Sequence, residues 1–279
     1  MNFEYTTVMN FKNAMRGMRN ALASWDRADS ICGYLPDDRF DSDLIEVATA
    51  WAETTEHYNE LSDKEQQDLI SHYASWLINK CNAGTLDYDE NNEVSSYAYI
   101  GPNDMKLMQT LIKAGSSHRK FLRQIFVSVD ISAGLHFWKE FDTYKVGTVA
   151  NSTSTMHKLA STPITLDCFD TDMGEEDSSS EDYDTIMHII GFLEELRKRY
   201  NDTKDKKYWR ELIQFLPESW IQKRTVTLSY ENVYAMIRDR HNHKLHEWSG
   251  KDDMIAANFI DWAHRLPYAE QLLFIGLEN

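Results

Sequence analysis

The segment 143–157 gathers side chains that can hold an anion. It reads Thr-Tyr-Lys-Val-Gly-Thr-Val-Ala-Asn-Ser-Thr-Ser-Thr-Met-His, so neutral donors surround the single cation, Lys145. Those donors are Thr148, Asn151, Ser152, Ser154 and His157. Hydroxyl and amide groups beside one ammonium group suit a phosphate or the edge of a pyrimidine. Composition alone equally allows an ordinary polar loop, and both interpretations stay open.

A second polar group is the sequence Arg-His-Asn-His-Lys-Leu-His-Glu at residues 240–247. On a helix, His243 and Glu247 would share a face, and imidazole and carboxylate groups are metal ligands. However, Arg240 and Lys244 lie among them, and these cations disfavour the binding of another cation. The HExxH order of zinc proteases is also absent. We therefore expect no metal site here and favour a polar helix face that can bind an anion.

Several other chemistries lack their usual motifs in this chain. No GxSxG surrounds a serine, and neither GxGxxG nor GxxxxGK[ST] occurs. The three cysteines, at positions 32, 81 and 168, are widely spaced and form no CxxC pair. This usage predicts neither a disulfide framework nor a zinc knuckle, and it favours a reducing, cytoplasmic compartment.

The balance of charge limits the partners that the chain can bind. The formal net charge is -16, and such an acidic surface repels duplex nucleic acid and anionic membranes. Basic residues gather at 118–120, 197–199 and 238–240. Each cluster is either a solvated face or a phosphate site for a small nucleotide. The N-terminus does not resemble a signal peptide, and no apolar run approaches the roughly 18 residues of a membrane span.

Hydrophobic periodicity predicts a helix-rich α+β fold with a small, mostly antiparallel sheet. The predicted helices are 9–25, 41–59, 62–84, 105–114, 132–142, 183–200, 208–215, 230–243 and 253–264. The predicted strands are 121–131 and 225–230, together with a hairpin over 85–100. We expect one domain over 1–279, with a helical N-terminal part (1–84) and an acidic, mobile loop (170–183).

The order of these features is similar to that of a known family. A helix ends at Gly-Ser-Ser-His (115–118), a strand and a helix follow, and then comes the polar segment 143–157. Later, Leu216-Pro217 precedes a Thr-rich extended piece and a helix that carries Arg240. Over roughly residues 100–160 and 210–275, this succession resembles the flavin-dependent thymidylate synthases (the ThyX family).

The resemblance assigns roles to individual residues. The family's Arg-His-Arg signature falls on Thr143-Tyr144-Lys145, where the planar forks of two arginines are replaced by a hydroxyl and a point charge. The nucleotide-binding residues that the resemblance implies are Arg240, Ser154, Lys145, Asn151 and Thr148. The implied cofactor-binding residues are His118, Tyr144 and His246.

The resemblance also implies a function. Members of the family methylate dUMP with FAD as hydride carrier and a methylene-folate as carbon donor, in a homotetramer. One hypothesis is therefore a flavoprotein transferase of pyrimidine nucleotide metabolism, acting on dUMP or a similar deoxynucleotide. A second is a catalytically inactive relative that binds a nucleotide as a sensor, or binds a protein, without flavin. A third is an unrelated helical interaction protein, and all three remain open.

Overall fold

The computed structural model describes most of the chain. The described residues are 1–34, 45, 48–49, 52–53, 55, 58–84, 87–88, 94–172, 177–250 and 257–277. Most of the predicted helix 41–59 lies outside them, as do residues 173–176 of the predicted acidic loop and residues 253–256 of the predicted helix 253–264.

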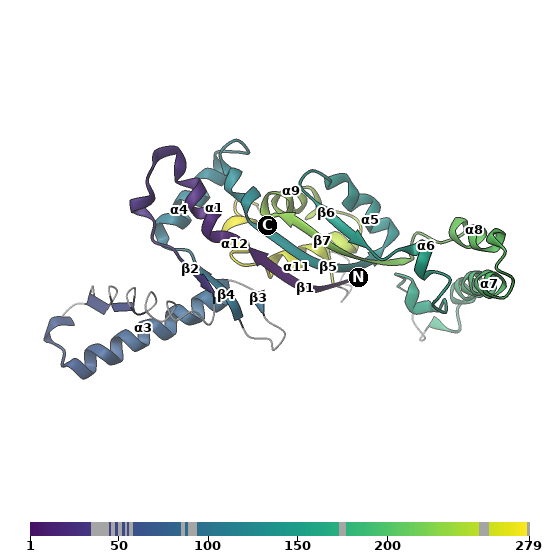
Figure 1. The fold of residues 1–279 in the computed structure, drawn as a ribbon, viewed down its shortest axis with the longest axis horizontal. Helices are drawn as coiled ribbons and strands as arrows, with labels where there is room; N and C mark the ends of the chain where they lie inside the picture. Colours follow the sequence, from purple (N-terminus) through teal and green to yellow (C-terminus); the bar gives the residue numbers. More distant parts are fainter. Residues whose placement is uncertain are drawn as a thin grey trace.

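A four-stranded antiparallel sheet forms the centre of the molecule (Figure 1). Its strands, in spatial order, are β1 (Asn2–Met9), β5 (Phe126–Gly134), β7 (Ile221–Ser229) and β6 (Val149–Ser152). All neighbouring pairs are antiparallel, which confirms the predicted α+β fold with a small antiparallel sheet. Strand β5 was predicted from residue 121, but residues Arg119–Gln124 form a 3₁₀ helix and the strand begins at Phe126.

One face of this sheet is buried and the other is polar. Along β5, Val127, Val129 and Ile131 are buried, whereas the residues between them are partly exposed, as the two-residue period of a strand requires. On the polar face, Thr225 donates a hydrogen bond to Asp130 at 2.6 Å. An antiparallel sheet with one solvated face explains this alternation.

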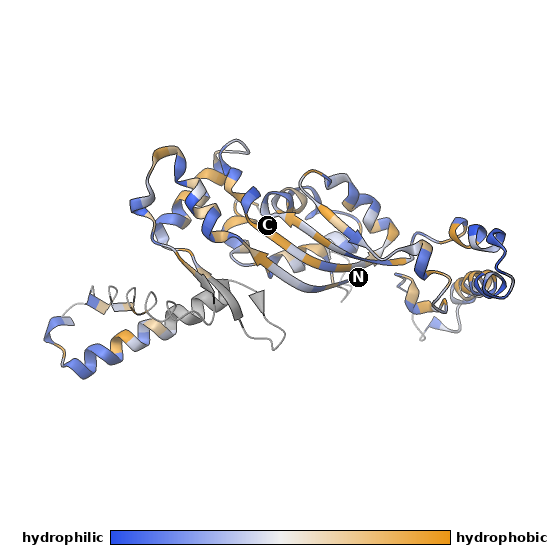
Figure 2. Ribbon diagram, viewed as in Figure 1, coloured by the Kyte–Doolittle hydropathy of each residue, from blue (hydrophilic) through white to orange (hydrophobic). Residues whose placement is uncertain are grey.

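Helices cover the buried face of the sheet. They are α1 (Phe11–Met18), α4 (Pro102–Lys113), α5 (Leu135–Phe141), α9 (Tyr230–Arg240), α10 (His246–Ser249), α11 (Phe259–His264) and α12 (Ala269–Leu272). Their apolar side chains join those of the strands in one core. Figure 2 shows hydrophobic residues concentrated along the strands of this central part.

The N-terminal part is less helical than predicted. The expected helix 9–25 is the short α1 followed by 3₁₀ turns, and β1 precedes it as a strand along the sheet edge. A second sheet has the order β2 (Ile31–Tyr34), β4 (Val94–Tyr99), β3 (Asp87–Tyr88). The antiparallel pairing of β3 with β4 confirms the hairpin predicted over 85–100.

The long helix α3 (Asp63–Gly84) begins where the sequence predicts. Its start has the reciprocal hydrogen bonds of a capping box, because Ser62 N donates to Glu65 Oε2 at 2.9 Å and Glu65 N donates to Ser62 Oγ at 3.5 Å. None of the helices in the part of the chain that the structure describes is both long and apolar enough to cross a bilayer.

A helical hairpin lies beyond one end of the central sheet (Figure 1). It consists of α7 (Glu181–Thr203) and α8 (Lys206–Gln214), both close to the predicted bounds. A separate apolar cluster holds it together, with Ile190, Leu193 and Leu196 of α7 packed around Leu212 of α8. The short helix α6 (Thr155–Lys158) connects β6 to this part of the molecule.

Candidate functional site

Two helix segments meet over a buried aromatic cluster and bring charged side chains together. Helix α5 begins directly after β5, and the turn from α9 to α10 lies against it. Phe137 and Phe141 of α5 pack on Trp248 of α10, with ring centroids 4.6 and 6.4 Å apart. Trp248 is fully buried. The indole and the two phenyl rings therefore hold the two segments in one relative position.

Two ion pairs cross between these segments. His136 Nε2 lies 2.7 Å from Glu247 Oε1, and Arg240 Nη2 lies 2.7 Å from Glu140 Oε2. His136 and Glu140 are four residues apart on α5, so they occupy one face of the helix. The signs of the charges alternate, with each segment contributing one acidic and one basic group. We call these four residues, His136, Glu140, Arg240 and Glu247, the α5 ladder.

Arg240 has further partners beside the α5 ladder. Its Nε donates a hydrogen bond to the Tyr144 hydroxyl at 3.0 Å, and its guanidinium lies 5.1 Å from the ring centroid of Trp248. The Tyr144 hydroxyl in turn donates to Asp239 at 3.1 Å. Among the described residues, the remaining nitrogen, Nη1, has no hydrogen-bond partner. This group of donors stands at the edge of the aromatic cluster, with the arginine side chain only 14% exposed.

The pKa values of these two groups reflect their surroundings. Burial raises the pKa of the Tyr144 hydroxyl above 10.0, although Arg240 opposes this shift. Burial lowers the pKa of Arg240, but the hydrogen bond to Tyr144 and the charge of Glu140 outweigh it, and the pKa is raised overall. At neutral pH, Tyr144 and Arg240 therefore present a protonated phenol and a charged guanidinium side by side.

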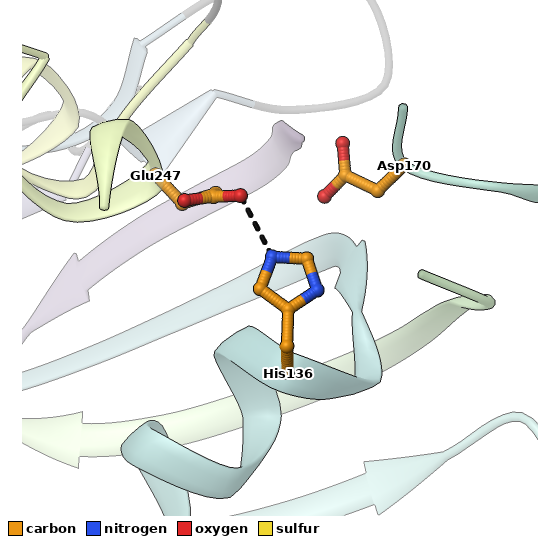
Figure 3. A group of neighbouring side chains, drawn as sticks. All are labelled: His136, Asp170 and Glu247. Carbon is orange, nitrogen blue, oxygen red and sulfur yellow. Dashed lines mark hydrogen bonds and ion pairs between the residues drawn. The ribbon is translucent and has the colours of Figure 1, made fainter. Parts of the chain in front are cut away.

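A third carboxylate lies next to the other end of the α5 ladder. Figure 3 shows His136 and Glu247 joined by their hydrogen bond, with the carboxylate of Asp170 facing them. One ligand atom from each of the three residues lies within 4.8 Å of the other two. Asp170 is held by its own contacts, since its Oδ2 accepts from Gly134 N at 3.1 Å and its backbone N donates to Ser219 O at 2.7 Å.

The backbone at Gly134 makes this close approach possible. A Cβ atom placed there would lie 2.5 Å from Cε1 of His136 and 3.3 Å from Cβ of Asp170. Burial lowers the pKa of His136, but the hydrogen bond and charge of Glu247 raise it further, and the pKa is raised overall. The imidazole therefore sits in an electronegative setting made by two carboxylates.

The predicted nucleotide-binding residues lie at the end of α9 and in the segment from Lys145 to Ser154. Arg240 lies with Tyr144, and Lys145 follows in an exposed turn, where Thr148 Oγ1 donates to Tyr144 O at 2.8 Å. Asn151 is exposed on β6, the edge strand of the sheet. Ser154 accepts a hydrogen bond from His157 N and so caps α6, a structural use of its hydroxyl.

The three predicted cofactor-binding residues are not brought together. Tyr144 lies at the C-terminal end of α9, with Arg240. His118 is exposed near the opposite end of that helix, since Arg119 pairs with Glu231 in the first turn of α9. His246 Nε2 lies 3.8 Å from Glu247 Oε1.

The predicted helix 230–243 ends early, and this changes the His-rich segment. Helix α9 stops at Arg240 and α10 starts only at His246, so His243 and Glu247 are not on one continuous helix. His243 instead accepts from Leu245 N at 3.2 Å. The metal pairing of these two residues, weighed from the sequence, is thus not formed, whereas Glu247 meets His136.

The sequence did not single out His136 or Asp170. Asp170 is the first of several acidic residues in the predicted loop 170–183, so nothing distinguishes it from the others. His136 is one polar residue in a helix rich in aromatic residues. The separations between positions 136, 170 and 247 match no known metal-binding motif. The only local signal was Gly134 before the helix, because a glycine at a strand end often marks a close approach of another side chain.

A cavity of about 740 Å³ lies elsewhere in the described part of the molecule. It is an open depression between the turns after α1 and helix α4, bordered by Arg19, Arg27 and Lys106. Arg19 is already engaged by the buried Asp104 at 2.6 Å. None of the residues predicted to bind a nucleotide borders this cavity, and no residue of the α5 ladder borders it either.

Comparison with known proteins shows similarity to solved structures only. No family model matches the chain, and no curated protein is similar in sequence. One solved structure is the flavin-dependent thymidylate synthase ThyX from Helicobacter pylori complexed with FAD and dUMP. It has 15% identity and a TM-score of 0.45, covering 63% of this chain and 83% of that one.

Two further structures are similar to the same degree. A second ThyX structure from Helicobacter pylori, with FAD and dUMP, has 13% identity and a TM-score of 0.45, covering 89% of this chain and 97% of that one. The UMP/dUMP methylase PolB from Streptomyces cacaoi, bound with 5-Br UMP, has 11% identity and a TM-score of 0.41, covering 62% and 83%. All three similarities are thus at low sequence identity, between 11% and 15%, and at TM-scores of 0.41 to 0.45.

Proposed function

We propose that this chain binds a pyrimidine deoxynucleotide, with its phosphate at the corner formed by Arg240, Tyr144 and Lys145. The observation that carries the proposal is the meeting of Arg240 and Tyr144, residues 96 positions apart, at a hydrogen-bond distance of 3.0 Å. The sequence resemblance assigned ligand-binding roles to both residues. Their contact supports one shared site.

The corner has the donors that a phosphate needs. A guanidinium offers its donors in a planar fork, and Nη1 of Arg240 has no partner among the described residues. Lys145 is exposed and has no ion pair within the described part of the chain. Its turn is ordered, because Thr148 N donates to Lys145 O at 3.2 Å and Asn232 Nδ2 donates to Val146 O at 2.7 Å. A phosphate there would meet two cations that are already positioned.

The pyrimidine would lie along the exposed edge strand β6. All four residues of this strand are exposed, and Asn151 and Ser152 offer amide and hydroxyl groups that can pair with the polar edge of a base. Trp248 is fully buried, so it supports Arg240 and offers no stacking face to the ligand. Specificity for a pyrimidine would therefore come from hydrogen bonds, with dUMP as the first ligand to test.

Flavin does not fit the same residues in the manner that the resemblance implies. The family's two arginine forks are replaced by Thr143 and Lys145. The other arginine beside α5, Arg224, is already paired with Asp142 at 3.0 Å. His118 and Tyr144 lie near opposite ends of α9. The proposed function is accordingly nucleotide binding, and no chemical step is routed through FAD.

The test compares dUMP with deoxyuridine, which lacks the phosphate, by isothermal titration calorimetry. Arg240→Ala should weaken dUMP binding by roughly 1.5–3 kcal/mol, the contribution of a hydrogen bond to a charged group. Binding of deoxyuridine should change little. Arg199→Ala is the matched control, since Arg199 is an exposed arginine on α7 that pairs with Glu195. Equal dUMP affinity in Arg240→Ala and the parent would refute the assignment.

A further inference from the structure

We propose that His136, Asp170 and Glu247 form a binding site for a divalent transition-metal ion such as Zn²⁺, Mn²⁺ or Co²⁺. The three residues come from α5, from the segment that pairs with Trp220, and from α10. Their ligand atoms lie within 4.8 Å of one another, and in Figure 3 the imidazole and the two carboxylates face a common space. The site is separate from the nucleotide corner, and its test does not depend on nucleotide binding.

The first argument is the unsatisfied carboxylate of Glu247. Its side chain is only 6% exposed, and Oε2 has no hydrogen-bond partner among the described residues. A buried carboxylate oxygen without a partner is costly, so such groups are generally paired or bound to a metal. The orphaned oxygen belongs to the same carboxylate whose Oε1 faces His136. A cation at this carboxylate would remove the penalty.

The second argument is the hydrogen bonding of the imidazole ring. His136 Nδ1 lies 3.3 Å from Glu218 O, and Nε2 lies 2.7 Å from Glu247 Oε1. Both neighbours accept hydrogen bonds, whereas a neutral imidazole carries only one N–H group. If Nδ1–H donates to the carbonyl, the lone pair of Nε2 points at a carboxylate oxygen. That arrangement is repulsive unless a proton or a metal ion lies between the two atoms.

This arrangement is also the one that metal-binding histidines use. In protein sites the second ring nitrogen commonly donates to a backbone carbonyl, which selects the tautomer and leaves the other nitrogen free for the metal. Glu218 O is in that position for His136. Asp170 is similarly oriented, because Gly134 N binds its Oδ2 at 3.1 Å. The supporting hydrogen bonds therefore aim both ligands before any ion is bound.

The ligand set decides the class of ion. One imidazole nitrogen and two carboxylate oxygens suit borderline first-row ions, whereas Ca²⁺ prefers oxygen alone. Ligands that bind an ion at about 2.0–2.2 Å lie about 3–3.5 Å from one another. The contact between His136 and Glu247 must thus lengthen by a few tenths of an ångström, and Asp170 must move inward. Three protein ligands would leave a coordination position open for water or another ligand.

Other charged groups border the site. The amino group of Met1 lies 3.4 Å from Asp170 Oδ1, and His246 Nε2 lies 3.8 Å from Glu247 Oε1. The His246 imidazole is a further nitrogen ligand within reach of the same carboxylate. The amino group would have to move away from the carboxylate that the ion takes. With two carboxylates and no fixed cationic side chain among the three ligands, the site has the charge to accept a divalent ion.

The experiment titrates metal-free protein, prepared by dialysis against a chelator, with Co²⁺ and follows its visible ligand-field absorption. Zn²⁺ is then added in competition. We expect one Co²⁺ per chain, displaced by Zn²⁺. His136→Gln and Glu247→Gln should each weaken binding by tenfold or more, a loss at least as large as that seen when a supporting group is removed from a metal site. Circular dichroism shows whether the variants remain folded.

Two control variants separate this site from adventitious binding. His264→Gln removes an exposed histidine that is paired with Glu270, and His243→Gln removes the histidine of the alternative pairing with Glu247. Both variants should bind Co²⁺ as the parent does. Asp170→Asn, which keeps an oxygen for Gly134 N, should weaken binding and retain the fold. Failure of the parent to bind Co²⁺ or Zn²⁺, or unchanged binding in His136→Gln and Glu247→Gln, would overturn the proposal.

Discussion

At the scale of single residues, the contacts within the α5 ladder determine which donors and acceptors remain available to a ligand. Arg240 is shared between Tyr144, Glu140 and the face of Trp248, so an incoming phosphate has to compete with one carboxylate. His136 is shared between Glu247 and a backbone carbonyl. The two basic residues therefore differ, because Arg240 keeps a donor available whereas the histidine lies between acceptors.

The competition at Arg240 leads to a prediction. Glu140 is 41% exposed, and a pair of this exposure contributes about 0.2–1 kcal/mol. Glu140→Gln removes this competitor and a repulsive charge, so dUMP should bind about two- to fivefold more tightly. Calorimetry measures the change. Glu195→Gln, which removes the partner of Arg199 on α7, is the control and should leave dUMP affinity unchanged. Weaker binding in Glu140→Gln would mean that Glu140 helps to hold the ligand.

At the scale of elements, an internal ion pair attaches the α7–α8 hairpin to the chain that leads into it. Arg197 binds Glu194 through two nitrogens at 2.7 and 2.6 Å, and Arg197 also donates to Ala160 O at 3.3 Å. Ile164 N donates to the same glutamate at 2.9 Å. The ion pair of Glu194 with Arg197 therefore joins α7 to residues 160–164, and the Glu194 side chain is only 17% exposed.

This contact predicts a pH dependence for the hairpin. The hydrogen bond from Arg197, opposed by burial, lowers the pKa of Glu194 from 4.5 to about 2. Because this pKa is depressed in the folded state, the stabilisation is present above pH 4.5 and is lost as pH falls towards 2. The shift corresponds to about 3 kcal/mol at most. Glu194→Gln should remove this stabilisation at neutral pH.

Hydrogen exchange measures this effect locally, because it reports the opening of α7 separately from that of β5. At neutral pH, amides of α7 should exchange faster in Glu194→Gln than in the parent, with those of β5 unchanged. Glu195→Gln is the matched control on the same helix, since its carboxylate is 59% exposed. Equal protection of α7 in all three proteins would show that the pair contributes no stability.

At the scale of the whole molecule, the hairpin presents apolar side chains that the described chain does not cover. Phe192 and Phe215 are 46% and 59% exposed, and their rings contact each other at 5.6 Å. Met187 of the same helix as Phe192 is also exposed. Large apolar side chains that gather on one surface commonly mark an interface. The homotetramer expected from the sequence resemblance stays a prediction, and this surface is the contact that we expect between two of its copies.

Multi-angle light scattering tests this assembly. The parent should have the mass of an oligomer, and Phe215→Asp should shift it to a smaller species, because a charge would be buried in the interface. Arg210→Asp changes an exposed residue of α8, the helix that ends just before Phe215, and should leave the mass unchanged. A parent with the mass of a single chain would contradict this expectation.

The single-domain organisation and the mobility of 170–183 likewise stay predictions, although Asp170 itself is held by Gly134 N.

The sequence by itself determined the elements whose signals are local. The apolar spacing of α7 and α9, the alternation within β5 and the capping box at Ser62 depend on residues a few positions apart, so those elements could be predicted. It missed β1, whose partly exposed residues have weak periodicity and which is a strand because β5 offers it a pairing edge. It also ended α9 three residues late, at 243 instead of Arg240.

Only the tertiary structure decided which polar residues meet. Arg240 and Tyr144 were each assigned to a binding site, but their contact spans 96 positions and depends on the packing of α5 against Trp248. His136 and Glu247 had no motif that linked them, because imidazole and carboxylate groups on separate elements carry no sequence spacing. Long-range pairs of this kind are set by how the aromatic core brings the elements together, and the periodicity of any one element does not contain that information.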